Sequence, residues 1–221
     1  MVIKRFSQEA LVIFARDPII GQVKTRLAED IGEMGALALY RVLLNNILAE
    51  SSLFSGDIFV ATTRAKTDYF SGYNTFLQKG RDLGEKMFNA FRKLLDKGYD
   101  RVIIVGSDIP ELTAKIIEKA TLLLKDNNVV IGPSRDGGYY LIGISKEGLL
   151  ADIFEGIAWG SATVLDDTVA NIARLNLTYK LLEVRNDIDT LDDLIEFSDK
   201  GEERELDMSE FLKQLEGDDE E

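Results

Sequence analysis

The chain has 221 residues and a formal net charge of −13, and 45% of its residues are hydrophobic. This hydrophobic content is enough to bury a core, so the composition excludes a wholly disordered chain. Histidine and cysteine are both absent, which excludes disulfides, thiolate zinc sites, cysteine nucleophiles and histidine general bases. Any chemistry must therefore use carboxylates, lysine, arginine, hydroxyls, backbone amides or a metal ion held by oxygen.

The acidic residues are concentrated toward the end of the chain. Residues 202–221 hold ten acidic and two basic residues, a net charge of −8, so residues 1–201 carry only −5. We expect a single domain over residues 1–201 and a solvated acidic tail over residues 202–221. The negative charge argues against binding to nucleic acid. No apolar run is long enough to span a bilayer and no signal peptide opens the chain, so we expect a cytoplasmic protein without a membrane span.

Apolar runs predict the strands, and helically spaced apolar residues predict the helices. Strands are expected at residues 10–15, 58–61, 101–106, 129–132, 139–143 and 179–184. Helices are expected at residues 35–51, 83–97, 112–125, 149–155, 162–174 and 191–197. This alternation predicts a three-layer α/β/α domain around a mostly parallel sheet. Such sheets bind ligands beyond the carboxyl ends of their strands, so the segments after the strands are the candidate site.

The segment after the first strand is basic in an otherwise acidic protein. Arg16, Lys24 and Arg26 lie in one loop that leads toward a helix, and Gly21 helps to shape it. Clustered cations beside a helix start suit a diphosphate or triphosphate. The segment is not a P-loop, because Val23 stands where that motif needs glycine. The alternative is a surface loop that happens to be basic.

Asp108 follows the most apolar strand, in the run Gly106-Ser107-Asp108-Ile109-Pro110. A carboxylate at a strand end can hold Mg²⁺ or Mn²⁺, which in turn bridges phosphate oxygens. Pro110 is typical of a helix start. Asp108 is alternatively a turn or helix-capping residue, the commoner role of Asp before Pro.

The run Asp136-Gly137-Gly138-Tyr139 lies between two predicted strands. On local grounds it is a hairpin turn. Its glycines would also let the backbone approach a ligand closely, which makes these four residues candidates for contact with an acceptor, and Asp136 a candidate for contact with a metal.

The segment 186–194 contains four aspartates. Thr190 and Asp193 have the spacing of a capping box, which explains them structurally. Asp187 and Asp189 precede that helix and have no such explanation, so they are candidate metal ligands.

Two weaker signals complete the set. The segment 78–87, with Asp82 as its candidate binding residue, either lies over the base or sugar of a nucleotide or is a plain helix start capped by Asp82. Trp159 either lines an acceptor pocket or packs in the core, which is the commoner role of a single tryptophan.

Together these segments resemble a bacterial family of GT-A-like proteins that are provisionally named nucleotide-diphospho-sugar transferases, some of them associated with arsenosugar biosynthesis. The resemblance runs from about residue 10 to residue 197. It rests on four motifs: Phe14-Ala15-Arg16-x-Pro18-x-x-Gly21-x-Val23-Lys24-Thr25-Arg26-Leu27, Gly106-Ser107-Asp108-x-Pro110, Gly132-Pro133-x-x-Asp136-Gly137-Gly138-Tyr139 and Asp187-x-Asp189-Thr190-x-x-Asp193-Leu194. The chain is also distantly similar to guanylyltransferases for the molybdenum cofactor and for phospholactate.

The resemblance implies a nucleotide-diphospho-sugar transferase (GT-A-like, Rossmann-like) fold and roles for particular residues. Asp108 matches a metal-binding aspartate, and Lys24 and Arg26 match residues that engage the nucleotide phosphates. Asp187 or Asp189 falls near the second metal ligand of related nucleotidyltransferases. We therefore expect Lys24 to face Asp108 across a space of pyrophosphate size, with Mg²⁺ or Mn²⁺ as the cofactor.

Three functions follow, in order of preference. The first is metal-dependent glycosyl transfer from a nucleoside-diphosphate sugar to a small acceptor, with Asp136 as the base in an inverting reaction. The second is nucleotidyl transfer, in which a phosphorylated small molecule attacks a nucleoside triphosphate and pyrophosphate leaves. The third is a nucleotide-binding module without catalysis.

Overall fold

A computed structural model of the chain describes residues 8–65 and 68–199, and the predicted acidic tail lies outside the described residues. The strands are β1 (Glu9–Phe14), β2 (Asp57–Thr62), β3 (Asn74–Leu77), β4 (Arg101–Gly106), β5 (Val129–Pro133), β6 (Tyr139–Ser145) and β7 (Tyr179–Leu181). The helices are α1 (Thr25–Ser51), α2 (Leu83–Leu95), α3 (Ala114–Leu123), α4 (Val164–Arg174) and α5 (Leu191–Asp199). Short 3-10 turns lie at η1 (Lys146–Gly148) and η2 (Ala151–Phe154).

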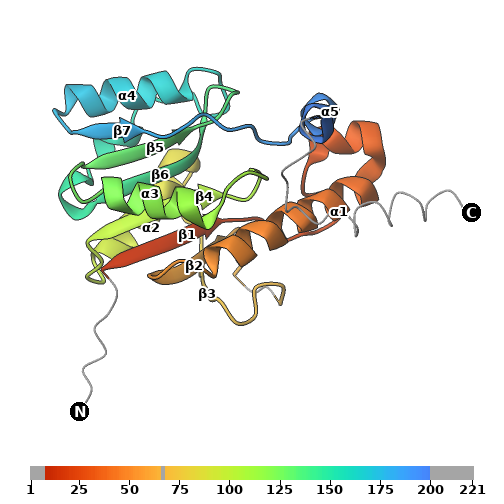
Figure 1. Ribbon diagram of the computed structural model, residues 1–221, viewed down its shortest axis with the longest axis horizontal. Helices are drawn as coiled ribbons and strands as arrows, with labels where there is room; N and C mark the ends of the chain where they lie inside the picture. The colour runs from red at the N-terminus through yellow and green to blue at the C-terminus, as the bar shows by residue number, and fades with distance from the viewer. Residues whose placement is uncertain (1–7, 66–67, 200–221) are drawn as a thin grey trace, which may run out of the picture.

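The strands form one sheet in the order β3-β2-β1-β4-β6-β5-β7 (Figure 1). Strand β1 is parallel to β2 and to β4, and β2 is parallel to β3. Strand β5 is parallel to β7. Strand β6 alone runs antiparallel to both neighbours, because a tight turn joins it to β5. The prediction of a mostly parallel sheet is confirmed.

Successive side chains of a strand point to opposite faces of the sheet, and here both sets are apolar. Helices therefore cover both faces. On one face, Leu11 and Ile103 pack with buried residues of α1 and α3. On the other face, Val12 and Ile104 pack with buried residues of α2, η2 and α4. The near-continuous apolar strands are therefore buried on both sides, as expected for a three-layer domain.

Helix α5 adds a third cluster outside these layers. Its Leu191, Leu194 and Phe197 pack with Ile188 on the outer side of α1, and Figure 1 shows the two helices side by side. This contact places the last described helix beside α1, the helix that begins at the end of the loop after β1.

Some predicted boundaries were wrong. Helix α1 begins ten residues before the predicted start at residue 35, with a kink at Gly32. Pro110 lies in a turn rather than at a helix start, because α3 begins only at Ala114. Strand β3 was not predicted: it is a short edge strand of largely exposed residues, so it has no apolar pattern.

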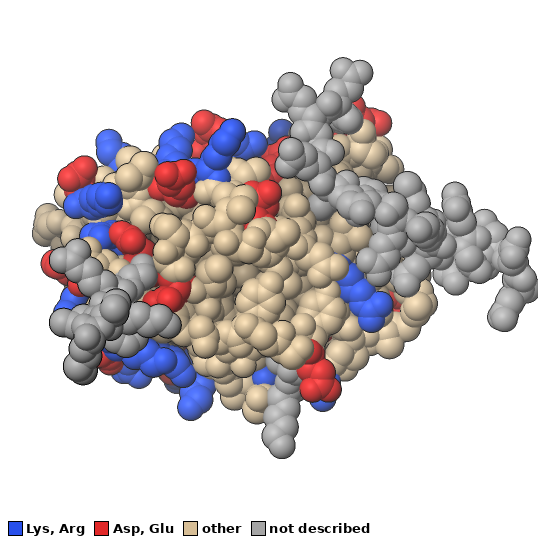
Figure 2. Space-filling view, turned by 60° about the horizontal axis from the view of Figure 1, so that its bottom comes forward, with Lys and Arg blue, Asp and Glu red and all other residues tan. Residues whose placement is uncertain are grey.

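No helix among the described residues is both long and apolar enough to cross a membrane. On the face shown in Figure 2, charged side chains of both signs lie mainly around the rim, and the middle is largely uncharged.

Candidate active site

The loop after β1 is held in place by side chains from other elements. The hydroxyl of Tyr40, on α1, accepts a hydrogen bond from the Arg16 amide at 2.9 Å and donates one to the Arg16 carbonyl at 3.0 Å. The side-chain amide nitrogen (Nε2) of Gln78 donates to the carbonyls of Ala15 and Ala61, which ties the ends of β1 and β2 together. The backbone at Ala15 and Arg16 is therefore fixed before any ligand binds.

Lys24 ends this loop in an unusual conformation. It precedes the first residue of α1 with φ 47° and ψ 43°, in the left-handed region that non-glycine residues rarely adopt. Such a conformation costs on the order of 1 kcal/mol or more and persists only where surrounding contacts enforce it. From this backbone the Lys24 side chain points into the protein, where it is 3% exposed and forms two ion pairs.

The Lys24 ammonium joins two carboxylates from distant parts of the chain. Its Nζ lies 2.8 Å from Oδ1 of Asp108 and 2.7 Å from Oδ1 of Asp189. The Lys24 side chain is 3% exposed, whereas those of Asp108 and Asp189 are 43% and 42% exposed. Burial alone would lower the pKa of Lys24, but the carboxylates of Asp108 and Asp189 outweigh it and raise that pKa. The lysine is therefore charged at physiological pH.

The predicted space between Lys24 and Asp108 is absent, because the two groups are in direct contact. The predicted convergence of Lys24, Asp108 and Asp189 is nevertheless observed. The end of β4 and the segment before α5 are joined by a hydrogen bond from the Ile188 amide to the Asp108 carbonyl, 3.2 Å long. This link places Asp189 beside Asp108.

The predicted capping box helps to hold Asp189. The Asp193 carboxylate accepts hydrogen bonds from the amides of Thr190 and Asp189, at 2.8 and 3.1 Å. In return, the Asp193 amide donates to the Thr190 hydroxyl. The box therefore fixes the backbone of a cleft residue as well as starting a helix.

Lys24, Asp108 and Asp189 line a cleft of about 870 Å³ at the carboxyl ends of β1 and β4. That volume falls within the range of small-molecule sites. Of the predicted nucleotide and metal residues, the cleft is lined by Arg16, Gly21, Lys24, Arg26, Asp108 and Asp189.

Several cleft residues were not predicted. Arg64 and Lys86 add two cations, from the segment after β2 and from α2. Tyr40 was assigned only to a helix, and burial raises its pKa to about 12. Asp17 is a buried acid within the basic loop. A basic residue two positions after a second parallel strand was the available signal for Arg64. Lys86 lies in the segment 78–87, which was expected near a base or sugar, and nothing local marks Tyr40.

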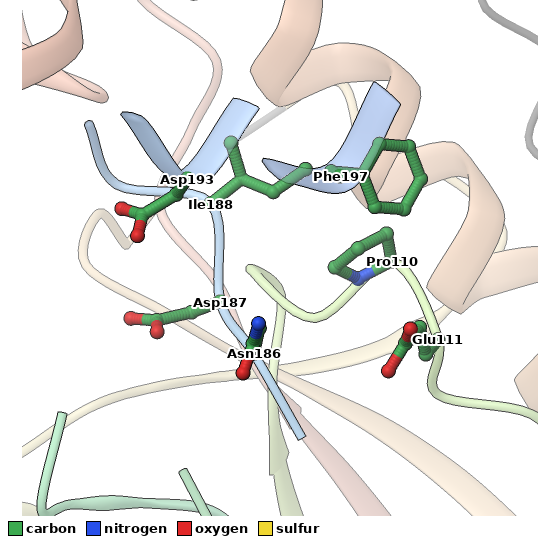
Figure 3. A pocket seen from close by; sticks show the side chains of 7 residues that line it. All are labelled: Pro110, Glu111, Asn186, Asp187, Ile188, Asp193 and Phe197. Atoms are coloured by element: carbon green, nitrogen blue, oxygen red, sulfur yellow. The ribbon is translucent and has the colours of Figure 1, made fainter. Parts of the chain in front are cut away.

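Asp187 lies just outside the cleft. It lines a small pocket of about 10 Å³, room for about one water molecule, beside Pro110 and Phe197. In Figure 3 its carboxylate points to the same side as that of Asp193, away from Phe197. Burial, then the charges of Asp136 and Asp189, raises the pKa of Asp187 to about 6.

The predicted acceptor residues do not line the cleft. The Asp136 carboxylate accepts hydrogen bonds from the Ser134 hydroxyl and the Gly138 amide, so it stabilises its own turn. A Cβ on Gly137 would lie 2.1 Å from the carbonyl oxygen of Ala162, so this glycine admits protein backbone. The hairpin interpretation of this turn accounts for these contacts.

Tyr139 and Trp159 pack against each other on the face covered by α2 and α4. The Tyr139 hydroxyl is out of contact with solvent, and the Trp159 ring lies against Gly84 and Phe154. Neither residue lines the cleft, and the contacts of Trp159 match the core-packing alternative.

Asp82 has the capping role that was its structural alternative. Its carboxylate accepts a hydrogen bond from the Glu85 amide at 2.8 Å and caps α2, and it is not among the cleft residues. Leu83, the next residue, does line the cleft.

Asp108 and Asp189 suit a hard cation in charge and ligand type. Within residues 8–65 and 68–199, no three acidic side chains gather closely enough to enclose a metal ion. Mg²⁺ needs only one or two carboxylates when phosphates and water complete its shell. The two carboxylates already converge on one positive charge, the Lys24 ammonium, and the donor set therefore fits a shared cation.

Comparisons with known proteins agree with this fold. A solved structure from Desulfovibrio desulfuricans G20, provisionally named a nucleotide-diphospho-sugar transferase, has a TM-score of 0.88 and 34% identity, and the match covers 96% of each chain. A CMP:2-keto-3-deoxy-manno-octonic acid synthetase has a TM-score of 0.56 and 12% identity, over 88% of this chain and 98% of that one. The latter similarity supports the fold alone.

Curated relatives are similar over part of the chain. A 2-phospho-L-lactate guanylyltransferase of Methanocaldococcus sp. (strain FS406-22) is 30% identical over 145 residues, which are 63% of this chain and 61% of that protein. A protein of the same name from Methanocaldococcus vulcanius is 26% identical over 93% of this chain and 90% of its own length.

The match to a family model spans more than half of the chain, residues 45–161, and includes α2, β4, the Asp108 turn and the β5–β6 hairpin. Together with the 34% identity over nearly the full length of the Desulfovibrio protein, it settles the relationship. The chain belongs to the family described as "Uncharacterized protein conserved in bacteria (DUF2064)".

Proposed function

We propose that this protein is a metal-dependent nucleotidyltransferase that joins the nucleotidyl group of a nucleoside triphosphate to a phosphorylated small molecule. The observation that carries the proposal is the contact of the buried Lys24 ammonium with Asp108 and Asp189 in a cleft lined by further cations. The names of the curated relatives, all guanylyltransferases, favour this reaction over the glycosyl transfer expected from the sequence.

The cations provide the charge that a triphosphate needs. Arg16, Lys24, Arg26, Arg64 and Lys86 all line the cleft, although the chain as a whole is acidic. A low-dielectric cleft lined with cations attracts phosphates and stabilises charge on a leaving pyrophosphate. Lys24 is the best placed of the five because its charge is already buried and oriented.

Mg²⁺ or Mn²⁺ bound by Asp108 and Asp189 would neutralise phosphate charge and help to align the triphosphate. When phosphate oxygens enter, the Lys24 ammonium can turn from the carboxylates to the phosphates, because both partners are half exposed and can be solvated. In this proposal Lys24 exchanges one set of anionic partners for another.

The reaction needs no general base. A phosphate oxygen of the acceptor attacks the α-phosphorus, a new P–O bond forms, and the bond to the β-phosphate oxygen breaks to release pyrophosphate. Because the nucleophile is already anionic, positioning and charge neutralisation account for the catalysis. This agrees with the placement of Asp136, which is engaged within its own turn.

Glycosyl transfer is the second candidate, on the strength of the similarity to the Desulfovibrio protein. The two reactions share the nucleotide end of the cleft and differ in their products. Nucleotidyl transfer releases pyrophosphate, and glycosyl transfer releases a nucleoside diphosphate.

The test measures both products with the full chain and Mg²⁺ or Mn²⁺. Each common nucleoside triphosphate is offered with 2-phospho-L-lactate and with a panel of sugar phosphates, and each nucleotide sugar with simple alcohol acceptors. We expect pyrophosphate, at least about 100-fold less of it with Asp108→Asn, and no change with the exposed control Asp30→Asn. The Tm of the protein is measured with and without each triphosphate. Release of nucleoside diphosphate in place of pyrophosphate, or no increase in Tm with any triphosphate, would overturn the proposal.

A further inference from the structure

Asp17 is the acidic residue of the basic loop, and it is buried at the cleft. It is 8% exposed and lines the cleft along with Arg16 and Lys24. Its Oδ2 has no contact with solvent and receives no hydrogen bond within the described part of the chain. An unpaired buried carboxylate oxygen is costly, and native proteins rarely keep one without a purpose.

The backbone around Asp17 is fixed on both sides. Tyr40 holds both polar groups of the Arg16 backbone, and the Asp17 carbonyl accepts a hydrogen bond from the Ile19 amide at 2.8 Å. Pro18 further restricts the conformation of Asp17. The backbone that carries the carboxylate is thus rigid, as the support of a selective binding group should be.

The charge of Asp17 decides which part of a nucleotide it can meet. The phosphate end of the cleft is marked by Lys24 with Asp108 and Asp189, and the Lys24 ammonium offsets the charge of these two carboxylates. Asp17 forms no ion pair within the described part of the chain, so its carboxylate would repel phosphates. Asp17 must therefore face a part that carries hydrogen-bond donors, either the base or the ribose.

Among the common bases, guanine alone offers two adjacent N–H donors on one edge, at N1 and at the N2 amino group. The two oxygens of one carboxylate match that pair in a bidentate contact, which for Asp17 requires the side chain to turn so that Oδ2 reaches the cleft. Adenine and cytosine present an acceptor beside their amino group, and uracil has one N–H between two carbonyls. A carboxylate facing those edges would leave at least one lone pair against another.

We propose that Asp17 selects the nucleobase by accepting hydrogen bonds from N1–H and N2–H of guanine. The proposal rests on the proposed function only in requiring a nucleotide in the cleft. It explains why a loop that must attract phosphates retains a buried acid.

The experiment measures equilibrium binding of nucleoside triphosphates without an acceptor, by calorimetry. ITP lacks the N2 amino group, so wild type should bind GTP about tenfold more tightly than ITP, and ATP more weakly still. Asp17→Asn should abolish the preference for GTP over ITP, because its amide group would face the guanine donors. The exposed control Asp30→Asn should retain that preference.

Two further measurements separate other roles. If Asp17 only supported the fold, Asp17→Asn would lower the Tm of the free protein and leave the GTP-to-ITP ratio intact. We expect a Tm that is unchanged or higher, since an unpaired buried charge is removed. If Asp17 bound the ribose, 2′-deoxy-GTP would bind about as weakly to wild type as GTP binds to Asp17→Asn.

Wild type alone suffices to overturn the proposal. Equal affinity of the wild-type protein for GTP and ITP would mean that the N2 amino group does not contact Asp17, regardless of the affinities measured for the variants. This outcome is distinct from failure of the proposed function. A preference for guanine can be measured without turnover. Turnover without selectivity for a base would contradict the proposed role of Asp17 and leave the proposed function standing.

Discussion

Two polar segments that follow strands differ in what their side chains contact. Around Lys24, side chains from the β1 loop, the end of β4 and the segment before α5 meet at an open cleft. In the turn between β5 and β6, one oxygen of the exposed Asp136 carboxylate accepts hydrogen bonds from Ser134 and Gly138, and the Ala162 backbone occupies the space beside Gly137. The difference shows that polar residues after strands gather at a cleft where long-range contacts bring them together, whereas short-range hydrogen bonds keep Asp136 within its own turn.

The largest expected effect is on nucleotide binding at the Lys24 cluster. Lys24→Met removes the buried ammonium and leaves Asp108 and Asp189 to repel phosphate, so affinity for GTP should fall about 100-fold. The free energy of unfolding should change by less than about 2 kcal/mol, because both carboxylates are half exposed and water can solvate them. Calorimetric titration and urea unfolding measure the two quantities.

The exposed lysine variant Lys125→Met is the matched control and should bind GTP as wild type does. Full retention of affinity in Lys24→Met would remove the phosphate role from this residue.

The glycine turn should show the reverse pattern. Gly137→Ala should lower the free energy of unfolding by about 2 kcal/mol or more, because φ is +88° and the new Cβ would collide with the Ala162 carbonyl. Affinity for GTP should be unchanged at temperatures where the variant is folded. Urea unfolding and titration together test this separation of the two regions.

Gly156→Ala is a control with a similar φ of +70° and no neighbouring atom within 4 Å of the new Cβ. It should cost only the conformational strain, about 1 kcal/mol. Equal costs in the two variants would show that contact with Ala162 is unimportant.

The capping box should couple a helix end to the cleft. Asp193→Ala removes the acceptor for the amides of Asp189 and Thr190, so unfolding free energy should fall by about 1 kcal/mol. Because Asp189 is then less firmly held, GTP affinity should fall several-fold as well. Asp192→Ala, an exposed neighbour, is the control, and an effect on stability without an effect on affinity would limit the box to helix capping.

The smallest effect concerns pH. The pKa of Asp187 is raised from 3.8 to about 6, so between these pH values the folded state keeps a proton that the unfolded state loses. Stability from this group therefore decreases as pH rises from about 4 to about 6 and stays reduced above that. Asp187→Asn should be more stable than wild type above pH 6, by up to about 1 kcal/mol given its partial exposure.

Below about pH 4 the two proteins should be equally stable, since both side chains are then neutral. Urea unfolding at pH 4, 5, 6 and 7 measures the difference. A constant difference across this range would mean that Asp187 does not titrate in it.

Comparison of the predictions with the structure shows where sequence patterns were informative. The buried strands and most helices packed on them were placed within a few residues, because burial on a sheet imposes apolar runs and helical spacing. The helix predicted at residues 149–155 was wrong, since only the 3-10 turn η2 forms there. Strand β3 and the first turns of α1 escaped prediction, since exposed and charged residues there carry no such periodicity. The capping box at Thr190 was predicted correctly because it depends on contacts three residues apart.

The site was predicted in part for the same reason. The sequence by itself determined that cations follow one strand and carboxylates follow two others, and parallel strands bring their carboxyl ends to one edge. Only the tertiary structure decided which of these groups meet. Lys24 joins Asp108 to Asp189, which is 165 positions from Lys24 along the chain. Asp136 stays exposed and bonded within its own turn, and the Tyr139 hydroxyl is buried. Long-range ionic contacts and the packing of α5 on α1 make that choice, and neither leaves a periodic signal in the sequence.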